Sequence, residues 1–177
     1  MNTRRTGLLA LLGFAVLVIG LLHGAVFPPA GRMLFGDDYQ SLINYQRIFF
    51  QWSLSHATLP LWNPYVYGGI PILEHPQTAF WYPLNLLFLL LPAQTAYPVD
   101  LSVHIFIAMT AMYFLMRRWV GRLPAIVSGI AYGMSTFFWY RIPAGHSNVI
   151  AAAAWAPLVF ALFWRVWARS SFSPCSD

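Results

Sequence analysis

The chain contains no lysine, a single cysteine and very few charged residues. Charged side chains make up 8% of its 177 residues, whereas a soluble domain carries about 25%. Cys175 has no second cysteine with which to form an internal disulfide and no metal-ligating residues near it in the sequence. The ten basic residues are all arginines, and they form no cluster with interleaved stacking residues. This pattern argues against nucleic-acid binding.

The residues that are present indicate an all-α integral membrane protein. Hydrophobic residues make up 59% of the chain, and aromatic residues 18%. The apolar run 7–27 has roughly the 20 residues needed to cross a bilayer. We interpret it as a retained signal anchor, because it is long for a signal peptide and His23 spoils the small-residue cleavage pattern. Further membrane spans are predicted at 99–119, 123–140 and 149–168.

The arginines decide how these spans are oriented. The apolar stretch 80–92 is too short to cross the membrane unaided and contains Pro83, so we expect it to lie in the interface. Three arginines, Arg32, Arg47 and Arg141, then lie outside. Seven lie on the cytoplasmic side, as the positive-inside rule favours: Arg4, Arg5, Arg117, Arg118, Arg122, Arg165 and Arg169. We therefore predict one membrane domain, 1–177, with both termini and the tail 169–177 in the cytoplasm.

The outer loop 28–98 is too apolar for a solvated loop. Its segment 38–56 places polar residues on one helical face and aromatic residues on the other, which predicts an amphipathic helix in the membrane interface. The topology gathers the candidate site residues at or near the outer face, with His104 about one turn inside the membrane. They are Asp37, Asp38, Arg47, Glu74, His75, Gln77, Asp100, His104, Arg141 and His146. Ionisable groups at membrane depth are functional candidates by default.

Some of these residues also have a purely structural interpretation. Asp37 followed by Gln40 matches a capping box, which stabilises the start of a helix without any chemistry. Asp100 and His104 are four residues apart and share one helical face, so they are either a functional pair or a satisfied pair between packed helices. Gly129 and Gly133 predict close packing of the span 123–140 against a neighbour.

Several short motifs occur in an order that resembles a known family. They are Gly36-Asp37-Asp38-Tyr39-Gln40, Pro60-Leu61-Trp62-Asn63-Pro64-Tyr65, Gly68-Gly69, Pro76-Gln77, Tyr82-Pro83-Leu84-Asn85 and Gly145-His146. Together they resemble the N-terminal part of the YfhO-type bacterial membrane proteins, in the GT-C superfamily of polytopic glycosyltransferases. The resemblance extends to about Trp167. Members of that family are several times longer, so we expect this chain to be a truncated part, inactive in isolation.

The resemblance implies transfer of a sugar from a polyprenyl-phosphate donor to a glycan or cell-envelope acceptor. The reaction would take place on the outer face of the bacterial cytoplasmic membrane. Asp37 or Asp38 would be the catalytic carboxylate that takes a proton from the acceptor hydroxyl, or the pair would hold a divalent metal ion. An outer arginine, Arg47 or Arg141, would pair with the phosphate of the carrier.

Two other classes of function stay open. The chain could be a non-catalytic accessory or lipid-binding subunit, which docks a partner through its outer loop. It could also be a channel or carrier that uses Asp100 and His104, although four spans lack the paired broken helices expected of transporters.

Overall fold

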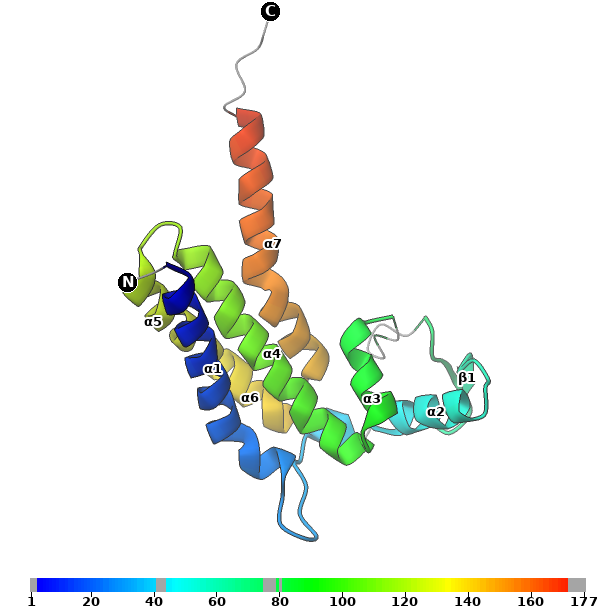
Figure 1. The fold of residues 1–177 in the computed structure, drawn as a ribbon. Coiled ribbons are helices and arrows are strands. Elements are labelled where there is room, and N and C mark those ends of the chain that lie inside the picture. Colours follow the sequence, from blue (N-terminus) through cyan, green and yellow to red (C-terminus); the bar gives the residue numbers. More distant parts are fainter. Residues whose placement is uncertain (1–2, 41–43, 75–78, 80, 172–177) are drawn as a thin grey trace, which may run out of the picture.

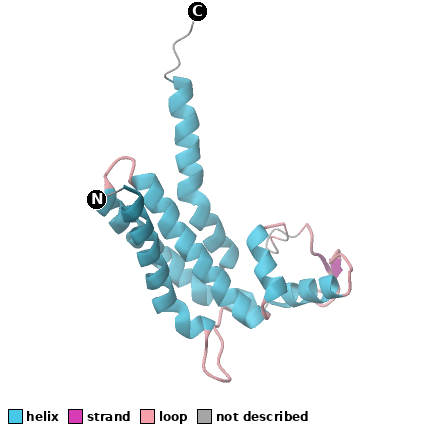
Figure 2. Cartoon of the chain, viewed as in Figure 1, coloured by secondary structure: helices cyan, strands magenta, loops and turns pink. Residues whose placement is uncertain are grey.

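The computed structural model describes residues 3–40, 44–74, 79 and 81–171. Figure 2 shows that most of this chain is helical. The elements in chain order are α1 (Thr3–Val26), α2 (Asn44–Ser55), β1 (Trp62–Asn63), β2 (Ile70–Pro71), the 3₁₀ helix η2 (Pro83–Leu86), α3 (Leu87–Leu90), α4 (Ala93–Met116), α5 (Arg122–Gly133), α6 (Thr136–Ala144) and α7 (Ser147–Ser171).

Within the described residues, three helices are long and apolar enough to cross a membrane. They are the segments Arg5–Val26, Gln94–Met116 and Ser147–Ala168, and they correspond to three of the four predicted spans. A charge-poor apolar run of this length crosses the hydrocarbon core as a helix. The chain is therefore a mainly helical membrane protein, as predicted.

The remaining predicted span, 123–140, is divided between two helices. α5 ends at Gly133, and α6 starts at Thr136. Ser135, just before α6, has an extended backbone that breaks the helical path. Sequence periodicity missed this break, because apolar residues continue on both sides of it. Figure 1 shows α5 and α6 running one after the other along the bundle.

Helix α4 lies at the centre and packs against α1, α5 and α7. Its inward face is fully buried and includes Leu101, Ile105 and Met109. Close packing against α5 depends on two glycines, as the sequence predicted. A Cβ atom on Gly129 would lie 2.7 Å from the Met109 carbonyl oxygen, and one on Gly133 would lie 2.5 Å from the Met109 side chain. Any larger residue would push the two helices apart.

The two ends of the bundle differ in chemistry. At one end, the guanidinium of Arg122 donates to Thr6 Oγ1 at 3.3 Å, and that of Arg118 donates to the Ala161 carbonyl at 3.5 Å. These bonds place the arginine cluster between α4 and α5 beside the start of α1 and the second half of α7. The acidic pair and most other candidate residues lie toward the opposite end.

The segment between α1 and α4 forms an arm beside the bundle (Figure 1). α2 covers residues 44–55 of the predicted helix 38–56, and the predicted helix 80–92 consists of the shorter η2 and α3. The polar face of α2 turns toward the protein, because Gln51 Nε2 donates to the carbonyl oxygens of Phe88 and Leu91. Tyr45, Ile48 and Trp52 are exposed on the other side.

Candidate functional site

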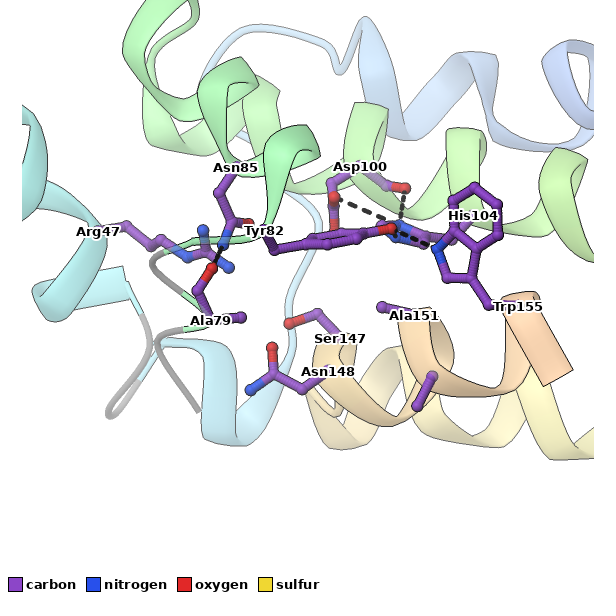
Figure 3. Close-up of a pocket in the computed structure, with 11 residues that line it drawn as sticks. Arg47, Ala79, Tyr82, Asn85, Asp100, His104, Ser147, Asn148, Ala151 and Trp155 are labelled. Atoms are coloured by element: carbon purple, nitrogen blue, oxygen red, sulfur yellow. Dashed lines mark hydrogen bonds and ion pairs between the residues drawn. The ribbon is translucent and has the colours of Figure 1, made fainter. Parts of the chain in front are cut away.

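A cavity lined by apolar surface and several polar side chains lies where α2, α4, α7 and the η2 segment meet (Figure 3). Its volume is about 270 Å³. Four kinds of group line it: one buried guanidinium, an Asp-His pair, several neutral polar side chains and a Trp-Ala wall. The lining residues are Arg47, Ala79, Tyr82, Asn85, Asp100, His104, Ser147, Asn148, Ala151, Ala152 and Trp155.

A continuous chain of hydrogen bonds crosses the cavity (Figure 3). The indole Nε1 of Trp155 donates to Tyr82 Oη at 2.7 Å, and Tyr82 Oη lies 2.7 Å from His104 Nε2. The Nδ1 atom of His104 lies 2.8 Å from the carbonyl oxygen of Asp100 and 3.3 Å from its Oδ1. A carbonyl oxygen only accepts, so Nδ1 carries the proton. Because Asp100 and His104 are one turn apart on α4, the helix itself sets this geometry.

Among the described residues that line the cavity, Arg47 is the only arginine, and it is 5% exposed. Its guanidinium lies over the ring of Phe88 at 4.1 Å from the centroid, an arrangement that favours a cation. Burial lowers the pKa of Arg47 and the charge of Asp100 opposes this. Even a lowered arginine pKa leaves the group charged near neutral pH. The site therefore holds a desolvated positive charge.

Three lining residues have buried polar atoms without a hydrogen-bond partner in the described chain. These atoms are Arg47 Nε, Asp100 Oδ1 and Ser147 Oγ. Buried polar atoms in folded proteins are nearly always hydrogen-bonded. Asp100 Oδ1 still has His104 Nδ1 at ion-pair distance, whereas Arg47 Nε and Ser147 Oγ are two donors without a partner among the described residues. Two such donors beside one cavity favour a polar ligand.

The acidic pair forms a second cluster near the start of α7. Asp38 Oδ2 lies 3.0 Å from Nε2 of His146, and His146 Nδ1 lies 3.1 Å from the Arg141 guanidinium. Arginine only donates, so Nδ1 accepts and Nε2 carries the proton that reaches Asp38. Arg141 in turn lies 4.5 Å from the centroid of the Phe137 ring. The side chain of Asp38 remains 54% exposed, so molecules outside the protein can reach it.

Two glycines hold the acidic segment against the end of α6. Gly145 has a φ of +80°, and a Cβ there would lie 2.4 Å from the Tyr39 nitrogen. A Cβ on Gly36 would lie 3.0 Å from the Gly145 Cα. Tyr39 fixes the segment from the other side, because its ring stacks on that of Tyr97 with centroids 3.8 Å apart. The position of Asp38 therefore depends on direct backbone contact between two distant parts of the chain.

The structure divides the predicted site residues between these two clusters. Arg47, Asp100 and His104 line the cavity. Asp38, Arg141 and His146 form the second cluster, and Asp37 is exposed beside them. Glu74 is exposed in the turn after β2 and belongs to neither. His75 and Gln77 lie outside the described residues.

Sequence reasoning missed several residues that complete the cavity. Tyr82 and Asn85 belong to a motif used only for the family resemblance, and no role was assigned to either. On α7, Asn148, Ala151, Ala152 and Trp155 follow one another at helical spacing, a signal of one continuous face. Small residues such as Ala151 and Ala152 on a membrane helix usually serve close helix packing, so they did not single out this face as part of a site.

A divalent metal ion at the acidic pair was one alternative that the family resemblance left open, and the structure gives no independent support for it. Within the described part of the chain, no three His, Cys, Asp or Glu residues are grouped closely enough to hold one. Asp38 and His146 are adjacent, but a stable site for a divalent ion requires more protein ligands than this pair.

No protein-family model, curated protein or solved structure matches this chain.

Proposed function

We propose that this chain is the N-terminal part of a membrane glycosyltransferase that uses a polyprenyl-phosphate sugar donor. The observation that carries the proposal is the link between the two clusters. His146 pairs with Asp38, and the next two residues, Ser147 and Asn148, line the cavity that contains Arg47. An exposed carboxylate and a buried cation thus lie on either side of the start of α7, as transfer from a phosphate leaving group to a hydroxyl acceptor requires.

In this proposal the cavity binds the phosphate of the donor. Guanidinium groups form strong charge-assisted hydrogen bonds to phosphate, and Arg47 has an unpaired Nε. The start of α7 adds the partial positive charge of a 25-residue helix. The apolar tail of the carrier lies in the membrane beside the exposed aromatic side of α2.

Asp38 acts as the base, with Asp37 beside it. The acceptor hydroxyl gives its proton to the carboxylate while its oxygen bonds to the sugar C1. The bond between C1 and the phosphate oxygen breaks, and polyprenyl phosphate leaves with both bonding electrons. His146 and Arg141 orient the carboxylate through the hydrogen bonds described above.

We further propose that α5 and α6 together make a fourth crossing, so that both termini lie in the cytoplasm and both clusters face outward. Two half-helices of 12 and 9 residues have roughly the length of a membrane span at 1.5 Å per residue. The location of seven arginines toward one end favours this orientation. The membrane would be the bacterial cytoplasmic membrane, with an envelope glycan as acceptor.

A genetic experiment tests this function. Cells that lack the gene are complemented with the full native protein, with Asp37→Ala/Asp38→Ala, or with the exposed-loop control Arg32→Gln, and envelope sugars are measured by mass spectrometry. The proposal expects one sugar modification to be lost in the deletion and restored by the wild type and the control only. Restoration by the double variant would refute catalysis by the acidic pair and would leave an accessory, lipid-binding role.

A further inference from the structure

The hydrogen-bond chain of the cavity has two states that differ in which groups Tyr82 can bind. Its phenol oxygen has one hydrogen to donate and two lone pairs that accept. One lone pair receives the hydrogen of Trp155 Nε1. What remains available to a ligand depends on His104, whose Nε2 is the other neighbour of the phenol.

The charge of His104 decides the direction of that bond. The Nδ1 proton is fixed by the Asp100 carbonyl oxygen. In the neutral ring, Nε2 therefore accepts, and Tyr82 must direct its hydrogen to it. In the imidazolium, Nε2 donates, so both lone pairs of Tyr82 are occupied and its hydrogen turns to the cavity. Protonation of His104 thus converts Tyr82 from an acceptor for a ligand into a donor.

A donor at this position suits an anion. Arg47 supplies one charge-assisted donor and Ser147 Oγ a second, whereas neutral His104 leaves Tyr82 presenting a lone pair that repels a phosphate oxygen. Tyr82 is held protonated in either state, because burial raises the pKa of its phenol. The phenol therefore changes direction rather than charge.

We propose that the cavity binds a phosphate-ester anion together with one proton, which His104 takes up and which turns Tyr82 into a hydrogen-bond donor to that anion. The identity of the anion as a lipid-carried phosphate diester rests on the proposed function, but the coupling to a proton rests on the hydrogen bonds alone. Tyr82 is then a ligand-binding residue, and His104 is a positioning residue that acts through it.

Other charges around Tyr82 do not reproduce this behaviour. On α4, Asp100 contacts His104 at Nδ1, on the side of the ring away from Tyr82. On α2, Arg47 keeps its charge near neutral pH. The face of α7 toward the cavity carries only neutral side chains among the described residues. Histidine is the side chain whose unperturbed charge changes between pH 5 and 8. The charged and titratable groups that share the cavity wall with Tyr82 in the described chain are Arg47, Asp100 and His104. Tyr39 and Tyr97 interact with Asp100 but do not line the cavity.

The test is binding of a diester whose own charge is constant. Farnesyl methyl phosphate carries one negative charge from pH 5 to 9, and its affinity for the full native protein in nanodiscs is measured across that range. If one proton is taken up on binding, the affinity for the probe should rise by up to about tenfold for each unit by which the pH is lowered. Tyr82→Phe should bind more weakly at pH 5 and lose most of this pH dependence. Dimethyl phosphate, the same diester without a lipid tail, shows whether a free phosphate ester suffices.

Tyr132→Phe is the matched control. Tyr132 is also half-buried and its hydroxyl donates to α7, at the Ala153 carbonyl, but it does not line the cavity. It should keep the wild-type pH dependence. If the wild type binds the probe equally at pH 5 and pH 8, fails to bind it, or shares its pH profile with Tyr82→Phe, the inference is wrong.

A second measurement removes any ambiguity from misfolding of the variant. In wild-type protein labelled with ¹⁵N-histidine, the probe should raise the pH at which His104 Nε2 gains its proton, as shown by the nitrogen shift. An unchanged His104 titration would overturn the inference. Neither measurement involves sugar transfer, so failure of this inference and failure of the glycosyltransferase proposal can be told apart.

Discussion

The Nε2 atom of His146 lies 3.0 Å from Oδ2 of Asp38, although 108 positions separate the two residues in the chain. This pair joins the first long loop to the α6–α7 junction. Both side chains are partly exposed, and ion pairs of this kind contribute about 0–1 kcal/mol to stability. The contact is therefore better suited to orienting a carboxylate than to holding the fold together.

The first prediction separates these two roles. His146→Gln and Asp38→Asn should each change the free energy of unfolding by less than about 1 kcal/mol, because the pair is solvent-screened. Sugar transfer should fall by about 10²–10⁴-fold in Asp38→Asn, the usual contribution of a general base, and less in His146→Gln. Thermal melting in detergent and a transfer assay measure the two effects. A large loss of stability with unchanged transfer would show a structural pair.

Gly145 gives a prediction about how the acidic segment is positioned. Gly145→Ala should destabilise the protein by about 1–3 kcal/mol, because its φ of +80° is strained for alanine and the Cβ would lie 2.4 Å from the Tyr39 nitrogen. Gly20→Ala is the control, since no heavy atom lies within 4 Å of its added Cβ. Reversible unfolding in mixed micelles compares them. Equal stability of both variants would contradict the described contact.

Arg47 allows a test of whether a buried charge serves ligand binding. Arg47→Met retains the length of the side chain and its contact with Phe88 but removes the charge. Removing one of two interacting buried charges leaves the other uncompensated, and for a close pair costs about 3–5 kcal/mol. Because the charge of buried Asp100 acts on Arg47, we expect lower thermal stability, with the affinity of the folded variant for farnesyl methyl phosphate reduced at least about tenfold. Unchanged affinity of the folded variant would instead assign Arg47 a purely structural role.

The buried phenol of Tyr39 should make the stability of the protein fall as the pH rises in the alkaline range. Burial is the main cause that raises the pKa of its phenol, with smaller opposing and supporting effects of Arg47 and Asp100. In the unfolded chain the phenol loses its proton near pH 10. Its contribution to stability is thus complete below about pH 10 and decreases as the pH rises toward the folded pKa. Tyr39→Phe should flatten the decline in stability above pH 10, whereas Tyr65→Phe, at an exposed position, should not. Unfolding monitored by near-UV circular dichroism measures both.

The divided third span can be located by labelling. In a Cys175→Ser background, Val120→Cys precedes α5 and Tyr140→Cys lies near the end of α6; both positions are exposed. If α5 and α6 cross the membrane together, a membrane-impermeant maleimide added to intact cells should label Tyr140→Cys and not Val120→Cys. Labelling of both from the same side would show that the pair of half-helices does not cross.

Apolar run length predicted the long helices, because a membrane span needs only composition and length. Gly129 and Gly133 were also predictable, since small residues on a helix indicate close approach. The break at Ser135 was not, because the surrounding residues stay apolar. Likewise the polar side of α2 was assigned from periodicity, which shows which residues share a face but not what that face contacts.

The sequence predicted only part of the candidate site, for a related reason. Asp100 and His104 lie one turn apart, so local geometry predicts their contact. Tyr82 reaches His104 from 22 positions away, and Trp155 reaches Tyr82 from 73 positions away. No local sequence pattern encodes these contacts. The sequence also gathered Asp37, Asp38 and Arg47 into one site, whereas the structure separates the acidic pair from the cavity by the start of α7.

The most direct test is sugar transfer by purified full native protein in lipid vesicles. Polyprenyl-phosphate donors carrying different labelled hexoses are supplied with envelope glycan, and labelled product is counted for the wild type, Asp37→Asn, Asp38→Asn and Arg32→Gln. We predict transfer from at least one donor, retained by Arg32→Gln and reduced at least about a hundredfold in Asp38→Asn. Wild-type transfer that survives both Asp variants, or no transfer from any donor, would contradict it.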